Sequence, residues 1–516
     1  MSSVQTIPYP GPPVSTWGTG VVGEVVVDSD GITFICVAGG RPGRWQKIGV
    51  PGGGPPYTPG AVFDVRKDFG ATGNGVTDDT AAIQAATDAA MPNGAVLFPP
   101  GQYLISSPIV VQNPDSSTTQ PNQIPFLYSD TPPGAVGDGT QFSAVEIVCS
   151  DTFPVGQFAL QFLGATSSVA PAGGGCKNLD VVCNDRGAGI LVHQPRRMVF
   201  ENLCIRHTAV PAASTGQPFG LAPSGAFSVE DSSGTAAAYN RFSNISVAYA
   251  GRRSFDYNST GKDSFFGCYS LDPATTNYRV GGMSSWYGCE YSGGEVAWLL
   301  NSNEALISGS KISRGTLVSS GGDVNAVLIY ALATADAGVG LVMFEGCRFQ
   351  SNPPSGVGAG NALLLVAPNT GRTINARFSG CTWNAYGNQS TVTVPYFAYI
   401  ESGVEGKIEI DGGVVAGTPA IGTFVDDSGN NVLSVRNVQG FNPTGAQTAP
   451  TVPASGTALT NPFPFDCTVY VNGGTVTEVA VGGTSTGATG GAFRVAAGQS
   501  ITLTYSAAPT WTWFGD

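Results

Sequence analysis

Two short stretches decide the fold of this chain: Phe265-Phe-Gly-Cys-Tyr-Ser270 and, 21 residues later, Trp286-Tyr-Gly-Cys-Glu-Tyr291. Each has a large apolar residue two positions before a glycine and a cysteine directly after it. The same pattern, with Asn or Gly at its centre and mostly apolar or small residues around it, recurs along most of the chain. The central residues are Asn178, Asn202, Asn244, Gly267, Gly288, Gly309, Gly346, Gly380, Gly412 and Asn437.

Asn and Gly are the residues that most readily adopt the left-handed backbone region. A turn at these centres lets the strands on both sides point their apolar side chains inward. The shortest separations between centres are 21–25 residues, which corresponds to one such turn in each coil of a solenoid. The repeat therefore predicts an all-β chain folded as a right-handed parallel β-helix. The longer separations, 202–244 and 309–380, predict loop insertions.

The composition agrees with a turn-rich β protein. Of the 516 residues, 72 are Gly and 36 are Pro, whereas charged residues make up 11% and hydrophobic residues 42%. The apolar content excludes a disordered chain, and the scarcity of charge excludes a coiled coil. Glycine without a three-residue period excludes collagen.

Charge and local composition also exclude several partners. The formal net charge is -13, whereas nucleic acids and anionic membranes attract basic proteins. The N-terminal residues lack the basic and apolar regions of a secretory signal peptide. The most apolar stretch, 326–344, is interrupted by polar residues and glycines and predicts two strands instead of a membrane span.

The chain has ten cysteines and no Cys-x-x-Cys pair, which predicts buried, reduced thiols and no metal site. No cofactor is predicted.

The chain is expected to divide into five parts. Residues 1–50 contain a hairpin signal and predict a small N-terminal β domain, followed by a Pro- and Gly-rich linker over 51–60. The β-helix is predicted over 61–440. Residues 441–460 are rich in Pro, Thr and Ala and predict a second linker. Four alternating segments in 461–516 predict a small antiparallel C-terminal domain.

The segment 63–103 predicts a strand, a Gly-rich turn, a helix and another strand. The helix is expected to begin at Asp78 and end at Ala90, where it would close one end of the β-helix. Asp78 and Asp79 stand at its N-terminus, where carboxylates stabilise free backbone amides. This capping role is preferred over the alternative, a carboxylate pair of the kind that cleaves glycosidic bonds.

The same segment resembles the start of the pectate-lyase-like parallel β-helices, through FGATGNGVTDDTAAIQAA and GAVLFPPGQY. That superfamily includes polygalacturonases, lyases and many bacteriophage tailspikes. The flanking sequences GEVVVDSDGITFICVAGG and NPFPFDCTVYVNGGTVTEVAVGG resemble modules of phage minor tail proteins, chiefly from phages of actinobacteria.

The resemblance implies a location and a set of partners. Such proteins are homotrimers in the virion tail, and the N-terminal region would attach this one to other tail or baseplate proteins. It would bind polysaccharide on the host cell surface during adsorption. The favoured interpretation is a binding protein without enzymatic activity, and the alternative is a glycan depolymerase of the phage tail, either a glycosidase or a lyase. A secreted pectinase is a distant third.

The catalytic motifs of the best-known relatives are missing. The Asn-Thr-Asp, Asp-Asp, Gly-His-Gly and Arg-Ile-Lys set of polygalacturonases does not appear on the coils, nor does the calcium-binding Asp cluster of pectate lyases. No catalytic residue is therefore predicted. Several acidic residues cannot be paired from the sequence, namely Glu230, Asp231, Asp256, Asp263 and Asp272.

The residue two positions after each turn centre is expected to face outward, because it lies between two inward-pointing residues of its strand. In successive coils these residues form one column along the β-helix. It contains Tyr269, Glu290, Lys311 and Arg348, which are the candidate glycan contacts. The alternative is a solvated ladder of ion pairs, in which Glu290 and Lys311 would form an exposed salt bridge. The whole column is Asp180, Cys204, Ser246, Tyr269, Glu290, Lys311, Arg348, Thr382, Val414 and Gln439.

Two further expectations concern buried groups. Cys268, Cys289, Cys347 and Cys381 share the place after the turn glycine and are predicted to point inward as reduced thiols. The C-terminal domain ends in three large aromatic residues, Trp511, Trp513 and Phe514, which exceed what about 56 residues bury comfortably. We therefore expect a parallel homotrimer in which the C-terminal domains pack together and close the open end of the β-helix.

Overall fold

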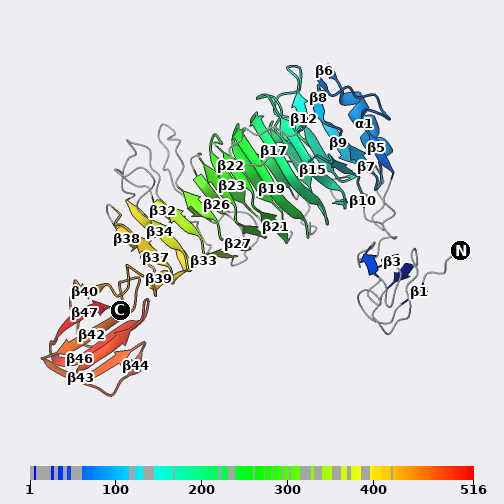
Figure 1. The fold of residues 1–516 in the computed structure, drawn as a ribbon. Helices are drawn as coiled ribbons and strands as arrows, with labels where there is room; N and C mark the ends of the chain where they lie inside the picture. The colour runs from blue at the N-terminus through cyan, green and yellow to red at the C-terminus, as the bar shows by residue number, and fades with distance from the viewer. Residues whose placement is uncertain are drawn as a thin grey trace.

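Figure 1 shows a computed structural model of the chain, in which a long stack of strands is followed at its C-terminal end by a separate β domain. Before residue 61 the structure describes the backbone of four strands, β1 (Gln5–Thr6), β2 (Val25–Val27), β3 (Thr33–Ala38) and β4 (Arg44–Lys47), which form one sheet. From residue 61 it describes all residues except 115–121, 132–143, 167–168, 219–220, 222, 231–238, 260–261, 272, 282, 293–295, 301–303, 314–326, 331–339, 351–361, 369–372, 385–394 and 420–421.

The stack is a right-handed parallel β-helix, as the repeat predicts, and three long sheets run along it. The first has 18 strands: β5 (Val62–Asp64), β6 (Asn74–Asp78), β7 (Ala95–Leu97), β8 (Gly101–Ile105), β11 (Phe126–Tyr128), β12 (Val145–Cys149), β15 (Gly175–Val182), β17 (Val199–Thr208), β19 (Arg241–Ala250), β21 (Asp263–Phe266), β22 (Tyr269–Leu271), β24 (Ser284–Tyr287), β25 (Glu290–Ser292), β27 (Glu304–Ser308), β30 (Gly340–Glu345), β33 (Thr373–Ser379), β36 (Glu405–Asp411) and β39 (Leu433–Arg436).

The second sheet faces the first across the core and has 11 strands: β9 (Ile109–Gln112), β13 (Leu160–Leu163), β16 (Ile190–His193), β18 (Gly225–Glu230), β20 (Arg253–Asn258), β23 (Thr276–Val280), β26 (Val296–Leu300), β29 (Val327–Tyr330), β32 (Ala362–Ala367), β35 (Tyr396–Ile400) and β38 (Gly422–Asp426). The third has four: β28 (Lys311–Ser313), β31 (Arg348–Gln350), β34 (Thr382–Asn384) and β37 (Val414–Ala416). Two short pieces complete the stack, the pair β10 (Asn122–Gln123) and β14 (Pro171–Ala172) and the 3-10 turn η1 (Ser214–Gly216).

The predicted turn centres are confirmed, because all ten residues have a left-handed backbone with φ between 52° and 71°. The residues two positions before them are buried in every coil. Three of the asparagines also form a ladder along the stack. Asn244 donates to Asn202 at 3.1 Å, Asn202 donates to Asn178 at 3.0 Å, and Asn178 donates to the Ser129 carbonyl at 2.8 Å. The ladder gives each of these side-chain amides a hydrogen-bond acceptor within the stack.

Aromatic rings stack inside the helix at the inward position before the turn. Phe242 stacks on Phe265 with ring centroids 4.4 Å apart, and Phe265 stacks on Trp286 at 3.7 Å. From the facing sheet, Trp298 meets Trp286 edge-on at 5.4 Å. Coils one repeat apart place equivalent side chains directly above one another, so each large ring packs on the next.

The four cysteines of the repeat are buried and unpaired by disulfides, as predicted. Cys268, Cys289, Cys347 and Cys381 are each at most 1% exposed. Burial raises the pKa of the Cys289 thiol well above its usual value. These thiols therefore serve as small core side chains.

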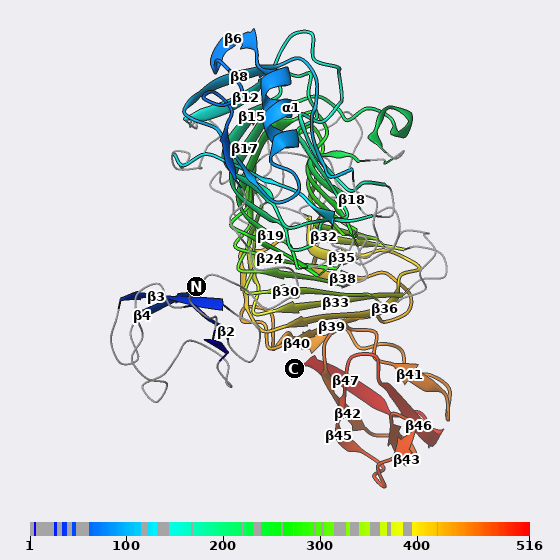
Figure 2. The same cartoon turned by 90° about the vertical axis from the view of Figure 1, so that its right-hand side faces the viewer.

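The helix α1 (Thr80–Ala89) lies at the N-terminal end of the stack, where it packs Ile83 and Ala86 on the first coils (Figure 2). It begins two residues later than expected. Asp78 accepts a hydrogen bond from the Thr80 amide at 3.0 Å, as a helix cap does. Burial alone would raise the pKa of Asp78, but hydrogen bonds from Ser106 and Thr80 outweigh it and lower that pKa. Among the described residues no helix is long and apolar enough to cross a membrane.

Asp79 has a different role from the predicted one. It occupies the N-cap position, but its side chain makes no hydrogen bond to the helix. Instead it accepts bonds from the Thr72 amide at 2.7 Å, the Thr72 hydroxyl at 3.1 Å and the Gly73 amide at 2.9 Å. Asp79 is 2% exposed. The carboxylate thus holds the Gly-rich turn against the helix.

Replacing Asp79 by alanine is expected to destabilise the protein by about 1–3 kcal/mol, because it leaves buried donors of Thr72 and Gly73 unpaired. Asp88→Ala, at an exposed position of the same helix, is the control and should change stability by less than ~0.5 kcal/mol. Urea denaturation midpoints of the two variants measure the difference. Equal midpoints would show that the Asp79 contacts contribute nothing.

The C-terminal domain is a sandwich of two antiparallel four-stranded sheets. One contains β40 (Gly445–Gln447), β47 (Thr510–Gly515), β42 (Cys467–Asn472) and β45 (Gly491–Val495). The other contains β41 (Ala458–Thr460), β46 (Ser500–Ala507), β43 (Thr475–Val481) and β44 (Thr484–Ser485). Residues 441–460, expected to form a linker, therefore supply β40 and β41 to this domain.

The trimer prediction assumes that the C-terminal domain cannot bury its three large aromatic residues, and this assumption is wrong for the two tryptophans. Trp511 is 7% and Trp513 is 1% exposed, since both pack between the two sheets of their own domain. Only Phe514, at 41%, stays exposed. On alternate positions of a strand, side chains point to opposite faces, so the two tryptophans share the inner face and Phe514 the outer one. The two tryptophans therefore leave almost no exposed surface that other copies of the chain could cover.

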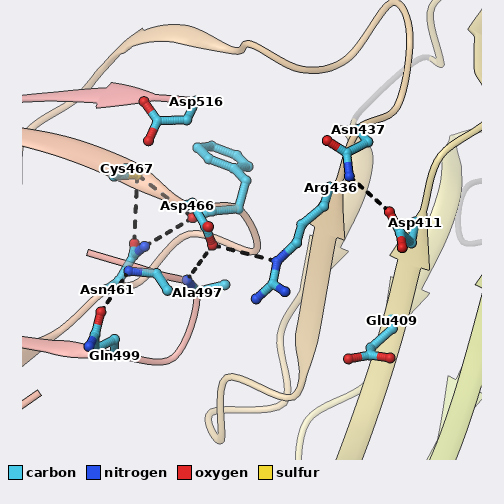
Figure 3. Close-up of polar contacts among 12 residues, drawn as sticks. Glu409, Asp411, Arg436, Asn437, Asn461, Asp466, Cys467, Ala497, Gln499 and Asp516 are labelled. Carbon is cyan, nitrogen blue, oxygen red and sulfur yellow. Dashed lines mark hydrogen bonds and ion pairs between the residues drawn. The ribbon is translucent and has the colours of Figure 1, made fainter. Parts of the chain in front are cut away.

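The sandwich itself covers the last coil of the β-helix. Phe441 packs against both cores, with ring centroids 4.9 Å from Phe424 and 5.8 Å from Phe465. Figure 3 shows the polar side of this junction, where Asp466 lies 3.7 Å from Arg436 and accepts a bond from the Ala497 amide. One chain therefore closes the end that was expected to require three.

Candidate functional site

The predicted outward column lies along one line of the β-helix. Tyr269 is the direct neighbour of Glu290 in the sheet, and Lys311 is the neighbour of Arg348. Glu290, Lys311 and Arg348 are exposed, and Tyr269 is half-buried. The structure therefore brings the four side chains onto a common surface, whereas their contact with glycan stays a prediction.

The ion pair expected within this column is not formed. Both Glu290 and Lys311 belong to the described part of the chain, and none of its salt bridges joins them. On a surface, the loss of side-chain entropy cancels most of the gain from such a pair. The two side chains thus remain available to solvent.

The first part of the column differs from the prediction, because outward-pointing positions there are buried. Asp180 and Ser246 are 0% exposed, and Cys204 is 4% exposed. Arg206 lies over this region, forms an ion pair with Glu146 and stands 3.6 Å from Asp180. The accessible part of the column consequently begins at Tyr269.

An aromatic pair that the repeat pattern alone does not single out lies beside the column. Phe266 and Tyr287 occupy the position directly before the turn glycine, on neighbouring strands. Their rings stack with centroids 5.1 Å apart at an angle of 13°, and Phe266 is 37% exposed. The guanidinium of Arg241 lies 5.5 Å from the Phe266 ring. The sequence does carry a signal for this pair, since two aromatic residues recur at one outward register position.

We call the five residues Arg241, Phe266, Tyr269, Tyr287 and Glu290 the turn ridge. It offers flat rings, a cation and a carboxylate on the outer surface of neighbouring coils. Contiguous exposed apolar surface is a feature of interaction sites. A pyranose ring presents an apolar C–H face and a rim of hydroxyl groups, which suit an aromatic platform flanked by charged side chains.

A second group, Glu230, Asp256 and their partners, lies on the outer side of the 11-stranded sheet and brings together acids that the sequence leaves unpaired. Asp256 on β20 is 1% exposed, stands 2.7 Å from Arg279 and 4.0 Å from Arg253, and accepts the Ser224 amide at 2.9 Å. Glu230 on the neighbouring strand β18 is 4% exposed. Glu230 and Asp256 lie 26 residues apart, about one coil, but the repeat pattern marks no position on the strands that carry them.

The two carboxyl groups have different electrostatic surroundings. Burial, together with the nearby charge of Asp256, raises the pKa of Glu230 to about 8. Glu230 accepts one bond from Asn258 at 3.2 Å, and its Oε1 has no hydrogen-bond partner in the described structure. A carboxyl group with a raised pKa beside one that is held by two arginines is an arrangement that can separate acid and base roles. Burial also raises the pKa of Asp263 to about 6.

The described residues contain no group of three or more His, Cys, Asp or Glu side chains that could hold a metal ion.

Part of the chain resembles known proteins in sequence. The family described as Rhamnogalacturonase A/epimerase, pectate lyase-like, matches residues 62–121. The mannuronan C5-epimerase AlgE5 of Azotobacter vinelandii is 62% identical over 42 residues, which are 8% of this chain and 4% of that protein. The chain spans 8% or less of the length of the curated relatives that it matches.

Two solved structures are similar over almost the whole chain. ORF18 of Geobacillus virus E2 has 14% identity and a TM-score of 0.41, and the match covers 98% of this chain and 89% of that one. The enzymatically active domain of tailspike protein 4 from bacteriophage CBA120 has 11% identity and a TM-score of 0.42, with 99% and 77% covered.

Proposed function

We propose that this chain is a bacteriophage tail protein that binds glycan on the host cell surface during adsorption. The observation that carries the proposal is the turn ridge, in which the exposed ring of Phe266 stacks on the half-buried ring of Tyr287. The β-helix supports it by holding these side chains on rigid neighbouring strands, which reduces the ordering cost of binding. The phage-like sequences that flank the β-helix support a place in the virion tail.

The same flanking sequences support the finer parts of the proposal. These are attachment to other tail or baseplate proteins through the N-terminal region, assembly as a homotrimer, and a phage of actinobacteria as the source. The candidate contacts Lys311 and Arg348 extend the ridge along the helix and add positive charge. An anionic envelope polysaccharide therefore fits this surface better than a neutral one.

Replacing both Phe266 and Tyr287 by alanine is expected to weaken binding to host-envelope polysaccharide at least ~10-fold, because the stacking surface is removed. Biolayer interferometry on immobilised polysaccharide measures the affinity. The control is Val155→Ala, an exposed apolar residue outside the column, which should bind like the wild type. Unchanged binding of the double variant, with unchanged melting temperature, would refute the ridge as the site.

A second candidate function is cleavage of the glycan, favoured by two buried carboxyl groups on neighbouring strands, Glu230 on β18 and Asp256 on β20, of which Glu230 has a pKa raised by burial and by the charge of Asp256. A protonated carboxyl and an ionised one are the groups that glycosidases use. Both side chains are at most 4% exposed, so a polysaccharide would reach them only if the surrounding chain moved. Release of new reducing ends by the wild type and its loss in Glu230→Gln would establish cleavage; no release would exclude it.

A further inference from the structure

The outer face of the C-terminal domain carries a polar surface with two exposed rings, separate from the turn ridge. Along β42 and β47, Val469, Val471 and the two tryptophans point into the sandwich. The alternate positions, Tyr470, Asn472, Thr512 and Phe514, point outward. Tyr470 is the direct cross-strand neighbour of Thr512. Figure 2 shows these two strands side by side at the centre of their sheet.

These four outward residues line a surface hollow of about 320 Å³. Tyr470 is 43% and Phe514 is 41% exposed. Their ring centroids lie 5.7 Å apart with the ring planes at 84°, so one ring presents its face where the other presents its edge. Asn472 and Thr512 add an amide and a hydroxyl group, and none of the four side chains carries a charge.

We propose that this hollow binds a neutral sugar unit of a glycan. Aromatic faces pack on the apolar C–H side of a pyranose, while an amide and a hydroxyl can donate to and accept from its hydroxyl groups. The hollow is at the small end of ligand sites, which begin near ~300 Å³, and this suits one monosaccharide of a chain. The absence of charge in its lining disfavours uronic acids and phosphorylated sugars.

A second copy of the chain is a poorer occupant. Interfaces of obligate oligomers resemble a domain core and are strongly apolar, whereas this face alternates its two rings with hydroxyl and amide groups. The apolar residues that could have formed such an interface, Trp511 and Trp513, are already buried. The proposal stands apart from the function proposed for the turn ridge, because it uses different residues on a different domain.

The test uses the full chain and an array of neutral hexaoses of glucose, galactose and mannose, with uronic-acid hexaoses as a comparison. We expect the wild type to bind at least one neutral hexaose and to prefer it over the uronic acids. The double variant Tyr470→Ala, Phe514→Ala should bind that hexaose at least ~10-fold more weakly by isothermal titration calorimetry. The variant Tyr470→Phe, Phe514→Tyr keeps both rings and should retain binding.

Two control variants separate binding in the hollow from binding elsewhere on the chain. The ridge variant Phe266→Ala, Tyr287→Ala should bind the neutral hexaose like the wild type, so failure of one site is distinguishable from failure of the other. Glu478→Ala, exposed on the opposite sheet, should also bind normally. The proposal is overturned if no neutral hexaose binds, if the alanine double variant binds equally well, or if that variant changes the mass of the assembly without changing binding.

Discussion

Replacing Trp286 by alanine is expected to destabilise the β-helix by about 3–5 kcal/mol, the range found for large aromatic residues removed from a core. Trp286 is 0% exposed. Its ring stacks on Phe265 at 3.7 Å and meets Trp298 at 5.4 Å. The cavity would lie between two sheets whose strands are fixed by neighbours on both sides, so the structure can collapse onto it only in part.

The adjacent residue provides the control for this prediction. Tyr287→Ala removes a large ring from the same strand, but from the outer face, and should destabilise by less than ~1 kcal/mol. Urea denaturation followed by tryptophan and tyrosine fluorescence measures both variants. Equal losses of stability would mean that the register of this coil is shifted by one residue, which would exchange the inner and outer faces.

The sequence predicts the repeat well because the turn has a strict local requirement. A left-handed residue at each corner needs Gly or Asn, and the inward neighbours need apolar side chains, so both requirements are visible within six residues. The predicted turns at Gly267 and Gly288 and the burial of Cys268 and Cys289 follow from this alone. The second sheet lacks such a marker, so the repeat does not predict its strands β18 and β20 individually.

The site residues are harder to predict because exposure depends on distant parts of the chain. Asp180 points outward as predicted, yet it is buried, since Arg206 and Glu146 gather around it from other coils. Glu230 and Asp256 come near each other because they lie about one coil apart in the sequence, in diagonal positions on the neighbouring strands β18 and β20. The residue pattern predicts whether a side chain points inward or outward, because the backbone sets that direction. Whether the side chain is buried, and which charges surround it, depends on tertiary packing.

The C-terminal domain shows the same limit for aromatic residues. Trp511, Trp513 and Phe514 counted together suggest a surplus of apolar surface, but strand alternation separates them onto two faces. The tryptophans stabilise the sandwich and Phe514 lines the hollow. The residues 441–460 contribute β40 and β41 although their composition resembles a linker, because edge strands tolerate Pro and small polar residues nearby.

Glu230 is expected to make the stability of the protein depend on pH. Its pKa is raised from 4.5 to about 8 in the folded protein, so between these values the folded state holds a proton that the unfolded state releases. The stabilising effect of that proton is fully present below pH 4.5 and is lost as the pH rises through about 8. Stability should therefore fall with rising pH, by about 1.4 kcal/mol for each unit at most.

Glu230→Gln tests this directly, because glutamine resembles the protonated acid and still accepts from Asn258. We expect the variant to be as stable as the wild type near pH 5 and more stable by several kcal/mol above pH 8. Asp263, with a pKa raised to about 6, acts in the same direction at lower pH, so urea midpoints between pH 6.5 and 8.5 isolate Glu230. Glu290→Gln, at an exposed position, is the control. Parallel pH profiles for all three proteins would show that Glu230 is ionised in the folded state, and would remove the observation that favours a catalytic role for it.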